Sequence, residues 1–465
     1  MSKLFKRPEH GKVQAAALEK VPNLKPTPPK TTKRDFKGST RANFKFLDYI
    51  WISLMWLGIS YLWGSVNGVI LPNLNSRYIA EDIKGTMLGI ITALGMVVAI
   101  VVQPAAGALS DVNQHLWGRR RPYMLVGGIS VVLVLIIMAA MVVFFGNWWM
   151  LLLFYLLLQF SDNVVQGAYQ GIIPDCVPPS RRGRASGAMG IAQILGNVSG
   201  LAVATLFIDL GRIELALLLI ALVVIVTLVS TFTTIREEPL RRTHESTSNF
   251  KIILKVLHEL RNYPDFIRFI VSRLCVLTAL ATLTIFALYY LQDVMGKREG
   301  TLTESYTLLG VVIITCSLLS IMPAVWLGDQ IGRKRLIIIA CGIGATGMVL
   351  LATATDMTQV MLYGSLIGIA TGSFNSLDWA LATDLIPQES AGRFMGISNL
   401  AGAGSQALAA LLGGGMRDGF NAIGTHLFNL PHLGYTALFL MGTCFFLLGI
   451  FFLRGVKDPA KSKVS

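Results

Sequence analysis

Apolar and polar residues follow one another along this chain in long blocks. Twelve apolar windows of about 20 residues are each long enough to cross about 30 Å of hydrocarbon as an α-helix. A polar segment at 236–268 separates the first six windows from the last six. The pattern predicts an all-α membrane protein with 12 transmembrane helices in two six-helix halves. The windows lie at 48–72, 86–109, 123–145, 148–173, 186–208, 213–235, 269–291, 306–327, 335–354, 359–383, 394–414 and 433–453.

The polar segments complete the predicted domain plan. Residues 1–47 carry twelve Lys and Arg against three acids and show no apolar period, so we expect a disordered, basic, cytosolic tail. This tail also lacks the apolar core of a signal peptide. The plan then runs through an N-terminal half at 48–235, a cytosolic linker at 236–268, a C-terminal half at 269–453 and a cytosolic tail at 454–465.

The distribution of charge predicts the orientation. With the N-terminus in the cytosol, inward segments hold 33 of the 40 Lys and Arg and outward loops hold six, as the positive-inside rule requires. We therefore expect a multi-pass protein of the cell membrane, surrounded by lipid, with both termini in the cytosol. The net charge of +14 is then mostly a topology signal, and no nucleic-acid partner is expected.

Composition argues against a soluble enzyme. Hydrophobic residues make up 53% of the chain and charged residues 14%, whereas soluble proteins carry about 25% charged residues. The five cysteines form no CxxC pair and the six histidines lie outside the windows, so neither a metal site nor a histidine relay is expected. The GxGxxG at 342–347 lies inside an apolar window without the strand and acid of a nucleotide site. We expect no enzyme activity, cofactor or metal.

The two halves repeat each other in sequence. Asp175–Pro178, four further residues and Gly183–Gly187 recur as Asp384–Pro387, four further residues and Gly392–Gly396. The spacing is identical and the offset is 209 residues. The repeat predicts two pseudo-symmetric halves built on one plan, a common architecture among transporters.

These residues resemble the major facilitator superfamily of transporters. Gly107–Arg121 is similar to the signature loop of the family between spans 2 and 3, and Gly328–Arg335 is similar to its second copy between spans 8 and 9. The resemblance covers about residues 45–455. It implies a twelve-helix secondary transporter that works by alternating access, and we expect a monomer.

Two shorter motifs resemble one branch of that superfamily. Gly118–Pro122 and Asn163–Gly167 look like the sucrose transporters and the glycoside-pentoside-hexuronide:cation symporters, in a bacterial-type relative. Plant sucrose carriers have an Asp where this chain has Gln159 and an Arg where it has Gln170. Their sugar and proton residues are therefore not carried over.

Each short turn at the predicted cytosolic end places an Asp after one helix and Arg before the next. Each charge has the unfavourable sign for the helix dipole beside it. Contact with water would account for basic residues in these turns, but not for the acid that accompanies them in every turn. We expect ion pairs between helices and between halves, and the resemblance implies that such pairs hold the cytosolic side shut. The residues are Asp111 with Arg119, Arg120 and Arg121; Asp175 with Arg184; Asp329 with Arg333; and Asp384 with Arg393.

Asp162 and Asp378 are the two acids deep inside apolar windows. A charge in mid-membrane is costly, so such residues normally face a cavity or a partner. Because burial disfavours a charged carboxylate, Asp162 could take up and release a proton as access alternates. We predict that Asp162 couples transport to H⁺ or Na⁺. Asp378 is the competing choice, and pairing with Arg273, expected at the edge of its span, would make either acid structural.

A polar arc on the fourth window predicts a solute site. Its side chains share one helical face, have counterparts at the 209-residue offset, and suit the hydroxyl groups of a polyol. The alternative is polar contact between helices, and Trp51 and Trp56 are expected to be interface anchors. The predicted site comprises Gln159, Asn163, Gln166, Tyr169, Gln170, Asn67, Asn197, Asn375 and Gln406.

Together these features predict a secondary active transporter for a sugar-like or other small polar solute, coupled to H⁺ or another cation. Two alternatives stay open. One is a drug–proton antiporter, although the fifth window lacks the Gly-Pro pattern typical of that group. The other is a superfamily member that transports nothing and handles a pigment or an assembly partner.

Overall fold

The computed structural model describes residues 46–113, 115, 117–144, 146–172, 177, 182–234, 263–296, 302–385 and 391–456. Within these ranges the side chains of a few helical residues, including Asp384 and Arg393, fall outside the description. The predicted tails and most of the predicted linker also lie outside it.

The N-terminal half contains six spans. The first is a continuous helix made of α1 (Phe46–Ser65), the π-helical η1 (Val66–Ile70) and α2 (Leu71–Tyr78). A π-helical turn is rare and often marks a functional position, and this one interrupts the first span near its middle. The other five spans are α3 (Lys84–Val112), α4 (Arg121–Phe144), α5 (Trp148–Tyr169), α7 (Arg182–Asp209) and α8 (Ile213–Thr234).

The C-terminal half repeats this arrangement. Its helices are α10 (Pro264–Asp293), α11 (Leu302–Ile331), α12 (Arg333–Leu351), α13 (Met357–Leu385), α14 (Ala391–Ile423) with η5 (Gly424–Phe428), and α15 (Leu433–Arg454). Among the described residues, eleven helical segments are long and apolar enough to cross a membrane, and α14 covers the one remaining predicted window, 394–414. The predicted fold class, an all-α membrane protein, is confirmed.

Several helices extend beyond their predicted windows, and in two of them, α10 and α14, the extension changes the place of buried charged residues. Helix α10 begins at Pro264 rather than at 269, so Arg273 lies nine residues inside it and is buried rather than at an edge. Helix α14 continues to Ile423 rather than ending at 414, and therefore contains Arg417 and Asp418. A hydropathy window ends where charged residues begin. The helix can continue past that point because other residues of the protein pair with those charges.

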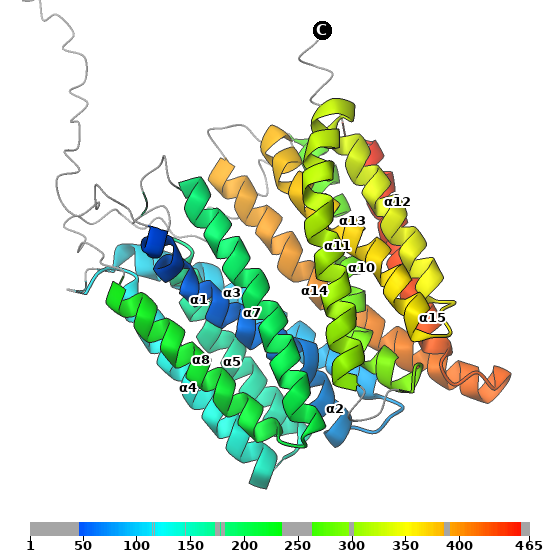
Figure 1. Cartoon of the computed structure of the whole chain (residues 1–465), viewed down its shortest axis with the longest axis horizontal. Coiled ribbons are helices and arrows are strands. Elements are labelled where there is room, and N and C mark those ends of the chain that lie inside the picture. Colours follow the sequence, from blue (N-terminus) through cyan, green and yellow to red (C-terminus); the bar gives the residue numbers. More distant parts are fainter. Residues whose placement is uncertain are drawn as a thin grey trace, which may run out of the picture. The chain divides into compact units, whose positions relative to one another are not determined.

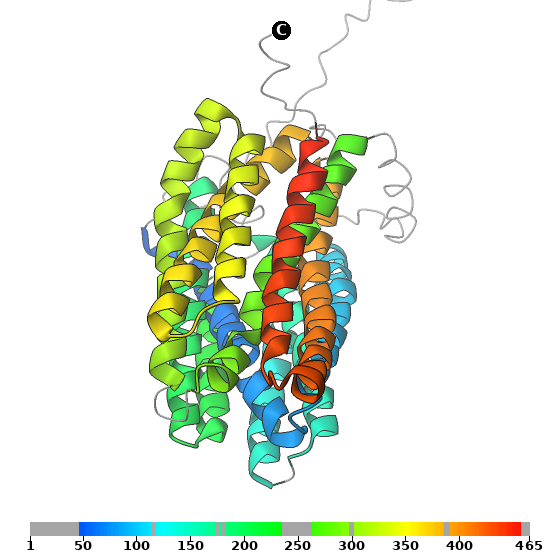
Figure 2. The same ribbon diagram turned by 90° about the vertical axis from the view of Figure 1, so that its right-hand side faces the viewer.

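The spans of each half pack mainly on one another, and the halves meet along two helix pairs. Figure 1 shows the N-terminal half in blue to green beside the C-terminal half in yellow-green to red, and Figure 2 faces the C-terminal half. Helix α3 packs on α14, and α7 on α11. The backbones of α3 and α14 lie so close at Gly414 that a Cβ atom there would be 2.2 Å from the carbonyl oxygen of Gly85. Glycine at this position permits the contact.

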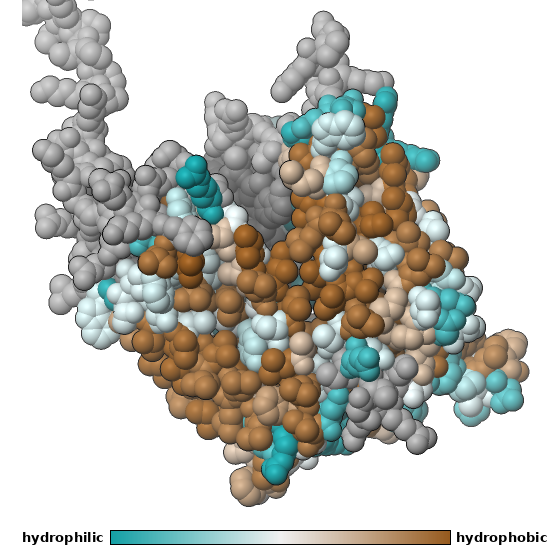
Figure 3. Space-filling model, viewed as in Figure 1, coloured by the Kyte–Doolittle hydropathy of each residue, from teal (hydrophilic) through white to brown (hydrophobic). Residues whose placement is uncertain are grey.

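The outer face of the helices is apolar. Large hydrophobic side chains such as Leu319, Met322 and Phe451 are largely exposed, and Figure 3 shows brown, hydrophobic residues across the visible face. Soluble proteins rarely expose continuous apolar surface on this scale. The face suits contact with lipid. Below, the end where α1 begins is named the predicted cytosolic end, and the end where α2 finishes is named the predicted extracellular end.

Candidate functional site

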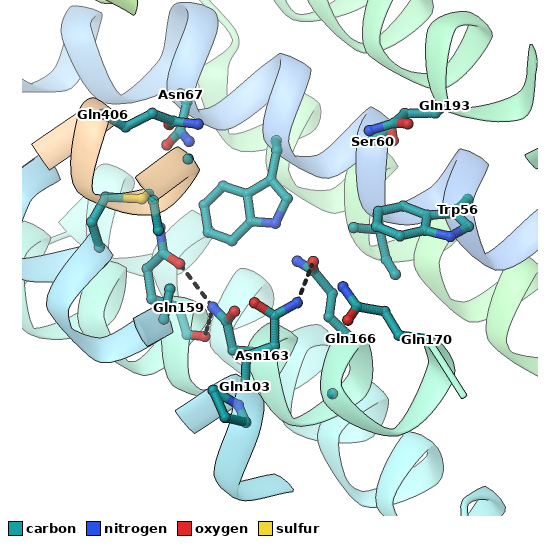
Figure 4. Close-up of a pocket in the computed structure, with 18 of the residues that line it drawn as sticks. Trp56, Ser60, Asn67, Gln103, Gln159, Asn163, Gln166, Gln170, Gln193 and Gln406 are labelled. Carbon is teal, nitrogen blue, oxygen red and sulfur yellow. Dashed lines mark hydrogen bonds between the residues drawn. The ribbon is translucent and has the colours of Figure 1, made fainter. Parts of the chain in front are cut away.

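A polar cavity of about 660 Å³ lies among α1, α3, α5, α7 and α14, and is named the central cavity here. Figure 4 shows its side chains pointing inward from several helices. Its polar lining consists of neutral groups, mostly amides, and two tryptophans provide flat faces. No charged side chain is among the described residues that line it. The amides are Asn67, Gln103, Gln159, Asn163, Gln166, Gln170, Gln193, Asn197 and Gln406, and the tryptophans are Trp56 and Trp63.

The cavity brings together most of the residues that the sequence predicted. Seven of the nine predicted solute residues line it: Gln159, Asn163, Gln166, Gln170, Asn67, Asn197 and Gln406. Asn375 lines a smaller cavity that adjoins it. Sequence reasoning missed Gln103 and Gln193. The signal that could have found them is that each is the one Gln inside its apolar window.

Two aromatic predictions need correction. Tyr169 does not line the cavity: it is fully buried and its hydroxyl donates a hydrogen bond to the backbone carbonyl of Ile52. It therefore holds α5 against α1 and is withdrawn as a solute residue. Trp56, expected to be an interface anchor, lines the cavity and packs its ring against Tyr169, with 6.1 Å between ring centroids.

The amides of α5 form an ordered chain of hydrogen bonds. Asn163 donates from Nδ2 to the Oε1 of Gln159 (3.1 Å), and Gln159 donates from Nε2 to the hydroxyl of Tyr155 (3.0 Å). Tyr155 in turn donates to the Oδ1 of Asn67 on η1 (3.1 Å). Because residues four apart share a helix face, the spacing of α5 aligns these groups. The chain links the polar arc of α5 to the π-helical turn of the first span.

Asp162 lies directly behind the cavity wall. It is 2% exposed, and both of its hydrogen-bond donors are cavity-lining side chains. The indole Nε1 of Trp63 donates to Oδ2 at 2.6 Å, and the Nε2 of Gln166 donates to the same oxygen at 2.5 Å. The carboxylate thus holds two groups that a solute would otherwise contact.

Asp378 has a different environment. It forms a buried ion pair with Arg273, joining α13 to α10, and neither residue lines the central cavity. We expected such a pairing to make the acid structural, so Asp378 is not retained as a candidate for cation coupling. Like the Trp63–Asp162 contact, this ion pair joins the first and fourth spans of its half, but at another level, because Asp378 is the counterpart of Tyr169 at the 209-residue offset.

Two of the predicted turn pairs are formed. The Nη2 of Arg120 lies 2.6 Å from the Oδ1 of Asp111, and Arg120 also donates to the carbonyl oxygen of Ala168 (3.2 Å). In the second half, Arg333 lies 3.8 Å from Asp329 and donates to the carbonyl oxygen of Ala380 (3.2 Å). Both arginines thus tie a turn to the end of a neighbouring span, in equivalent positions. Both pairs lie within their own half.

The other predicted turn residues have separate environments. Arg121 donates to the carbonyl oxygens of Trp117 and Phe232 and lies 4.2 Å from the ring centroid of Phe232. The backbone carbonyl of Arg119 accepts from Asn113 (3.1 Å), and Arg184 is exposed. Asp175 and the side chains of Asp384 and Arg393 lie outside the described residues. Pairs between the halves at this end stay a prediction.

Charged residues join the halves at the predicted extracellular end. Lys84 of α3 pairs with Asp293 of α10 at 2.9 Å. Arg417 of α14 pairs with Asp293 and with Glu81, both at 2.7 Å, and with Asp418 at 2.8 Å. These five residues are named the outer cluster here. Lys84 and Arg417 are almost completely buried, whereas Glu81 is exposed, so the cluster closes this end around two buried cations.

Hydrogen bonds beneath the outer cluster reinforce the closure. The carboxylate of Asp418 accepts from the backbone amides at the start of α3, with 2.5 Å to Thr86. Tyr289 donates to the carbonyl of Pro72 (2.9 Å), and Tyr306 donates to the carbonyl of Gly68 (3.0 Å). The central cavity, in contrast, reaches Gly107 and Gln170, near the predicted cytosolic ends of α3 and α5. The halves are therefore held together on one side of the cavity.

Comparison with known proteins identifies the family. The model of the Major Facilitator Superfamily matches residues 54–410 and also residues 301–465, which is most of the chain. This protein therefore belongs to the Major Facilitator Superfamily, a family of transporters rather than enzymes.

Similar curated proteins share only a short region. The MFS-type transporters MT1926 and Rv1877 of Mycobacterium tuberculosis, both uncharacterised, are 28% identical to this chain over 114 residues. That region is 24% of this chain and 16% of each relative. It says nothing about the rest of those proteins.

Solved structures show the same fold at low sequence identity. A D-xylose-proton symporter has a TM-score of 0.69 and 17% identity, with 90% of this chain and 99% of that chain covered. The nucleoside transporter NupG has a TM-score of 0.64 and 15% identity, with 88% and 98% covered. A bacterial homologue of the human lysosomal transporter Spinster, inward-facing and occupied, has a TM-score of 0.68 and 13% identity, with 89% and 97% covered.

Proposed function

We propose that this protein is a secondary active transporter that carries a small, neutral, sugar-like solute across the cell membrane together with a proton. The observation that carries the proposal is the amide- and tryptophan-lined central cavity, with Asp162 held directly behind its wall by Trp63 and Gln166. Because a single chain contains the whole cavity, we propose that the monomer is the working unit.

The chemistry of the lining favours a neutral solute. Transfer of a charge out of water is costly unless an opposite charge meets it, and the described lining has none. Amide groups both donate and accept hydrogen bonds, which matches the hydroxyl groups of a polyol. Tryptophan faces pack against apolar ring surfaces. A sugar-like solute combines these two features, as the resemblance to sugar:cation symporters also suggests.

Asp162 offers a direct link between proton and solute. In the charged state its Oδ2 engages the N–H groups of Trp63 and Gln166. A protonated carboxyl group accepts hydrogen bonds more weakly, so both donors become free to bind a solute. Binding of the proton therefore favours binding of the solute, and the reverse follows by linkage. Such positive coupling drives both in the same direction across the membrane.

A proton suits this site better than Na⁺. The oxygen that would coordinate a cation already accepts two N–H groups, and a metal ion would have to displace both. Among the described residues, no group of three or more acidic, His or Cys side chains gathers to hold a metal. We therefore choose H⁺ among the cations that the sequence left open.

The two alternative functions fit the cavity less well. A drug–proton antiporter for lipophilic cations needs an acid that meets the cation, whereas the described lining of this cavity carries no charge. A member that transports nothing has no use for a polar cavity closed on one side by a buried ion network. We also propose that the outer cluster and the predicted cytosolic pairs alternate in closing the two ends.

The test is uptake into proteoliposomes that contain the purified full chain. A panel of labelled neutral sugars and nucleosides is offered with an inward proton gradient. We expect saturable accumulation of at least one solute, abolished by a protonophore. Saturable flux that ignores the gradient would remove the proton, and absence of flux for every neutral solute would contradict the transport proposal.

A further inference from the structure

A second cavity of about 340 Å³ adjoins the central cavity and shares Asn67, Gly402 and Gln406 with it. Helices α3, α10, α13 and α14 form its walls, so both halves contribute. Leu88 on its α3 wall lies one helical turn from Lys84 of the outer cluster. The second cavity is thus the deeper of the two, beneath the closed end.

The walls of this second cavity are chemically unlike those of the first. Five aliphatic side chains line it: Leu88, Leu277, Leu280, Ala281 and Ile285. Three of its four hydroxyl groups donate to backbone carbonyls of their own helices. Thr371 donates to the carbonyl of Ile367 (2.7 Å), Thr284 to that of Leu280 (3.2 Å) and Ser405 to that of Gly402 (2.6 Å). They therefore have no hydrogen left to donate to a ligand.

Two amides mark the polar edge of the second cavity. The side chains of Asn375 and Gln406 are exposed to it, and Gln406 lies at the junction with the central cavity, beside Asn67 in Figure 4. Asn67 and Gln406 thus stand where the two cavities meet, whereas Asn375 and Thr92 line the second cavity alone, beside its aliphatic side chains. A purely polar solute would fill the first cavity and leave the second to poorly hydrogen-bonded water.

We propose that the preferred solute has two parts: a neutral polar ring bound in the central cavity, and a compact apolar substituent, aryl or alkyl, bound in the second cavity. This inference rests on the proposed function and adds the apolar half of the solute to it. The solute then lies with its apolar end toward the outer cluster. Both cavities fall in the size range of small-molecule sites, and burial of the apolar group supplies affinity that hydrogen bonding alone does not.

Matched pairs of sugars test the inference. The probes are the methyl and phenyl β-D-pyranosides of glucose, galactose and xylose, titrated calorimetrically into the full chain in detergent. We expect the phenyl member of the best pair to bind at least about tenfold more tightly than its methyl partner. Equal affinities within every pair that binds would overturn the inference.

A variant that fills the second cavity tests whether the tighter binding of phenyl glycosides depends on that cavity. Ala281 lines the second cavity and not the first, so Ala281→Leu should abolish the phenyl advantage and leave methyl binding within about threefold. Ala281→Ser, which keeps the space, is the matched control and should retain the advantage. Thr284→Leu, at an exposed position of the same wall, replaces Ala281→Leu if that variant does not fold. An advantage that survives the filling variant would also overturn the inference.

The same titrations separate this inference from the proposed function. If methyl glycosides bind and are transported but phenyl groups add nothing, the second cavity has no role in binding and the transport proposal stands. If no member of any pair binds, the inference fails, and the uptake panel of sugars and nucleosides alone decides the transport proposal.

Discussion

The indole nitrogen of Trp63 donates a hydrogen bond to Asp162 across 2.6 Å, and this contact connects the first span to the fourth. Trp63 belongs to the wall of the central cavity, whereas Asp162 lies behind it. In the proposed transport cycle, one side chain therefore meets both the solute and the carboxylate that we propose as the proton site. This relationship explains how a buried acid can respond to an occupant that it does not touch.

Replacement of Trp63 by Phe should separate these two roles. Trp63→Phe keeps an aromatic face for the solute and removes one of the two donors that stabilise charged Asp162. A hydrogen bond to a charged group contributes about 1.5–3 kcal/mol. The proton should therefore stay bound to a higher pH, and the midpoint of the pH profile of driven uptake should move up by about one unit. Uptake rates across a pH series measure this.

A matched variant shows whether the donor matters rather than the ring. Trp56→Phe removes an indole from the same cavity but not from Asp162, and should leave the pH profile in place. Equal profiles for wild type and Trp63→Phe would disprove the link between the indole and the acid.

The outer cluster should control the closed state of the predicted extracellular end. Asp293→Asn removes the acid that Lys84 and Arg417 share, and loss of one partner from a buried ion pair costs about 3–5 kcal/mol. We expect the population to shift toward a state that is open at this end. Spin labels at exposed Ala80 and Thr355, one on each half, should report a longer distance.

The matched control for Asp293→Asn is an acid at the opposite end of the same helix, α10. Asp265 pairs with Arg268 in the first turn, and both are partly exposed, so Asp265→Asn should leave the distance unchanged. An unchanged distance in Asp293→Asn as well would mean that the cluster does not hold this end shut.

The pair of Asp111 with Arg120 should affect turnover more than affinity. Arg120 is buried and Asp111 is half exposed, so Asp111→Asn leaves a buried guanidinium with weaker compensation in a turn that must move. We expect a several-fold loss of kcat at nearly constant KM, because binding can survive when the exchange between states is impaired. Steady-state uptake measures both constants.

Asp329→Asn is the matched comparison for that turn. The separation of Asp329 and Arg333 is 3.8 Å, and Asp329 is more exposed, so the effect should be smaller. Normal kcat in Asp111→Asn would refute a role for this pair in the gate.

Asp378 should support the fold rather than coupling. Asp378→Asn removes the carboxylate that pairs with the buried Arg273, and loss of one member of a buried ion pair costs about 3–5 kcal/mol. The thermal transition of the purified protein should fall by several degrees. Joint replacement, Arg273→Met with Asp378→Asn, should recover much of the loss. A variant that keeps its thermal transition but loses gradient-driven uptake would instead return Asp378 to the coupling role.

The sequence was sufficient to predict the spans and much of the cavity, because both depend on local pattern. The arc of Gln159, Asn163 and Gln166 follows from helical periodicity, and the lining of the cavity agrees with it. Periodicity does not say which neighbour covers an arc, however. Tyr169 shares the predicted arc, yet it is turned onto the backbone of α1.

The outer cluster could not be predicted, because it depends on how the halves dock. Lys84 and Asp293 lie just beyond the ends of apolar windows, where a charge is ordinarily in contact with water. Their contact joins residues 209 positions apart, and a hydropathy profile contains no distance of this kind. Arg273 could be named from the sequence as a possible partner for Asp162 or Asp378, but which of the two acids it pairs with depends on the packing of α10 on α13.

The most direct test of the central claim is Asp162→Asn in proteoliposomes, with proton-driven uptake and solute exchange measured on the same preparation. Asparagine keeps an oxygen that can accept from Trp63 and Gln166 but cannot bind or release a proton. The account predicts that accumulation against a gradient is lost, while exchange of solute across the membrane continues within about threefold of wild type. Undiminished driven uptake in this variant would contradict it.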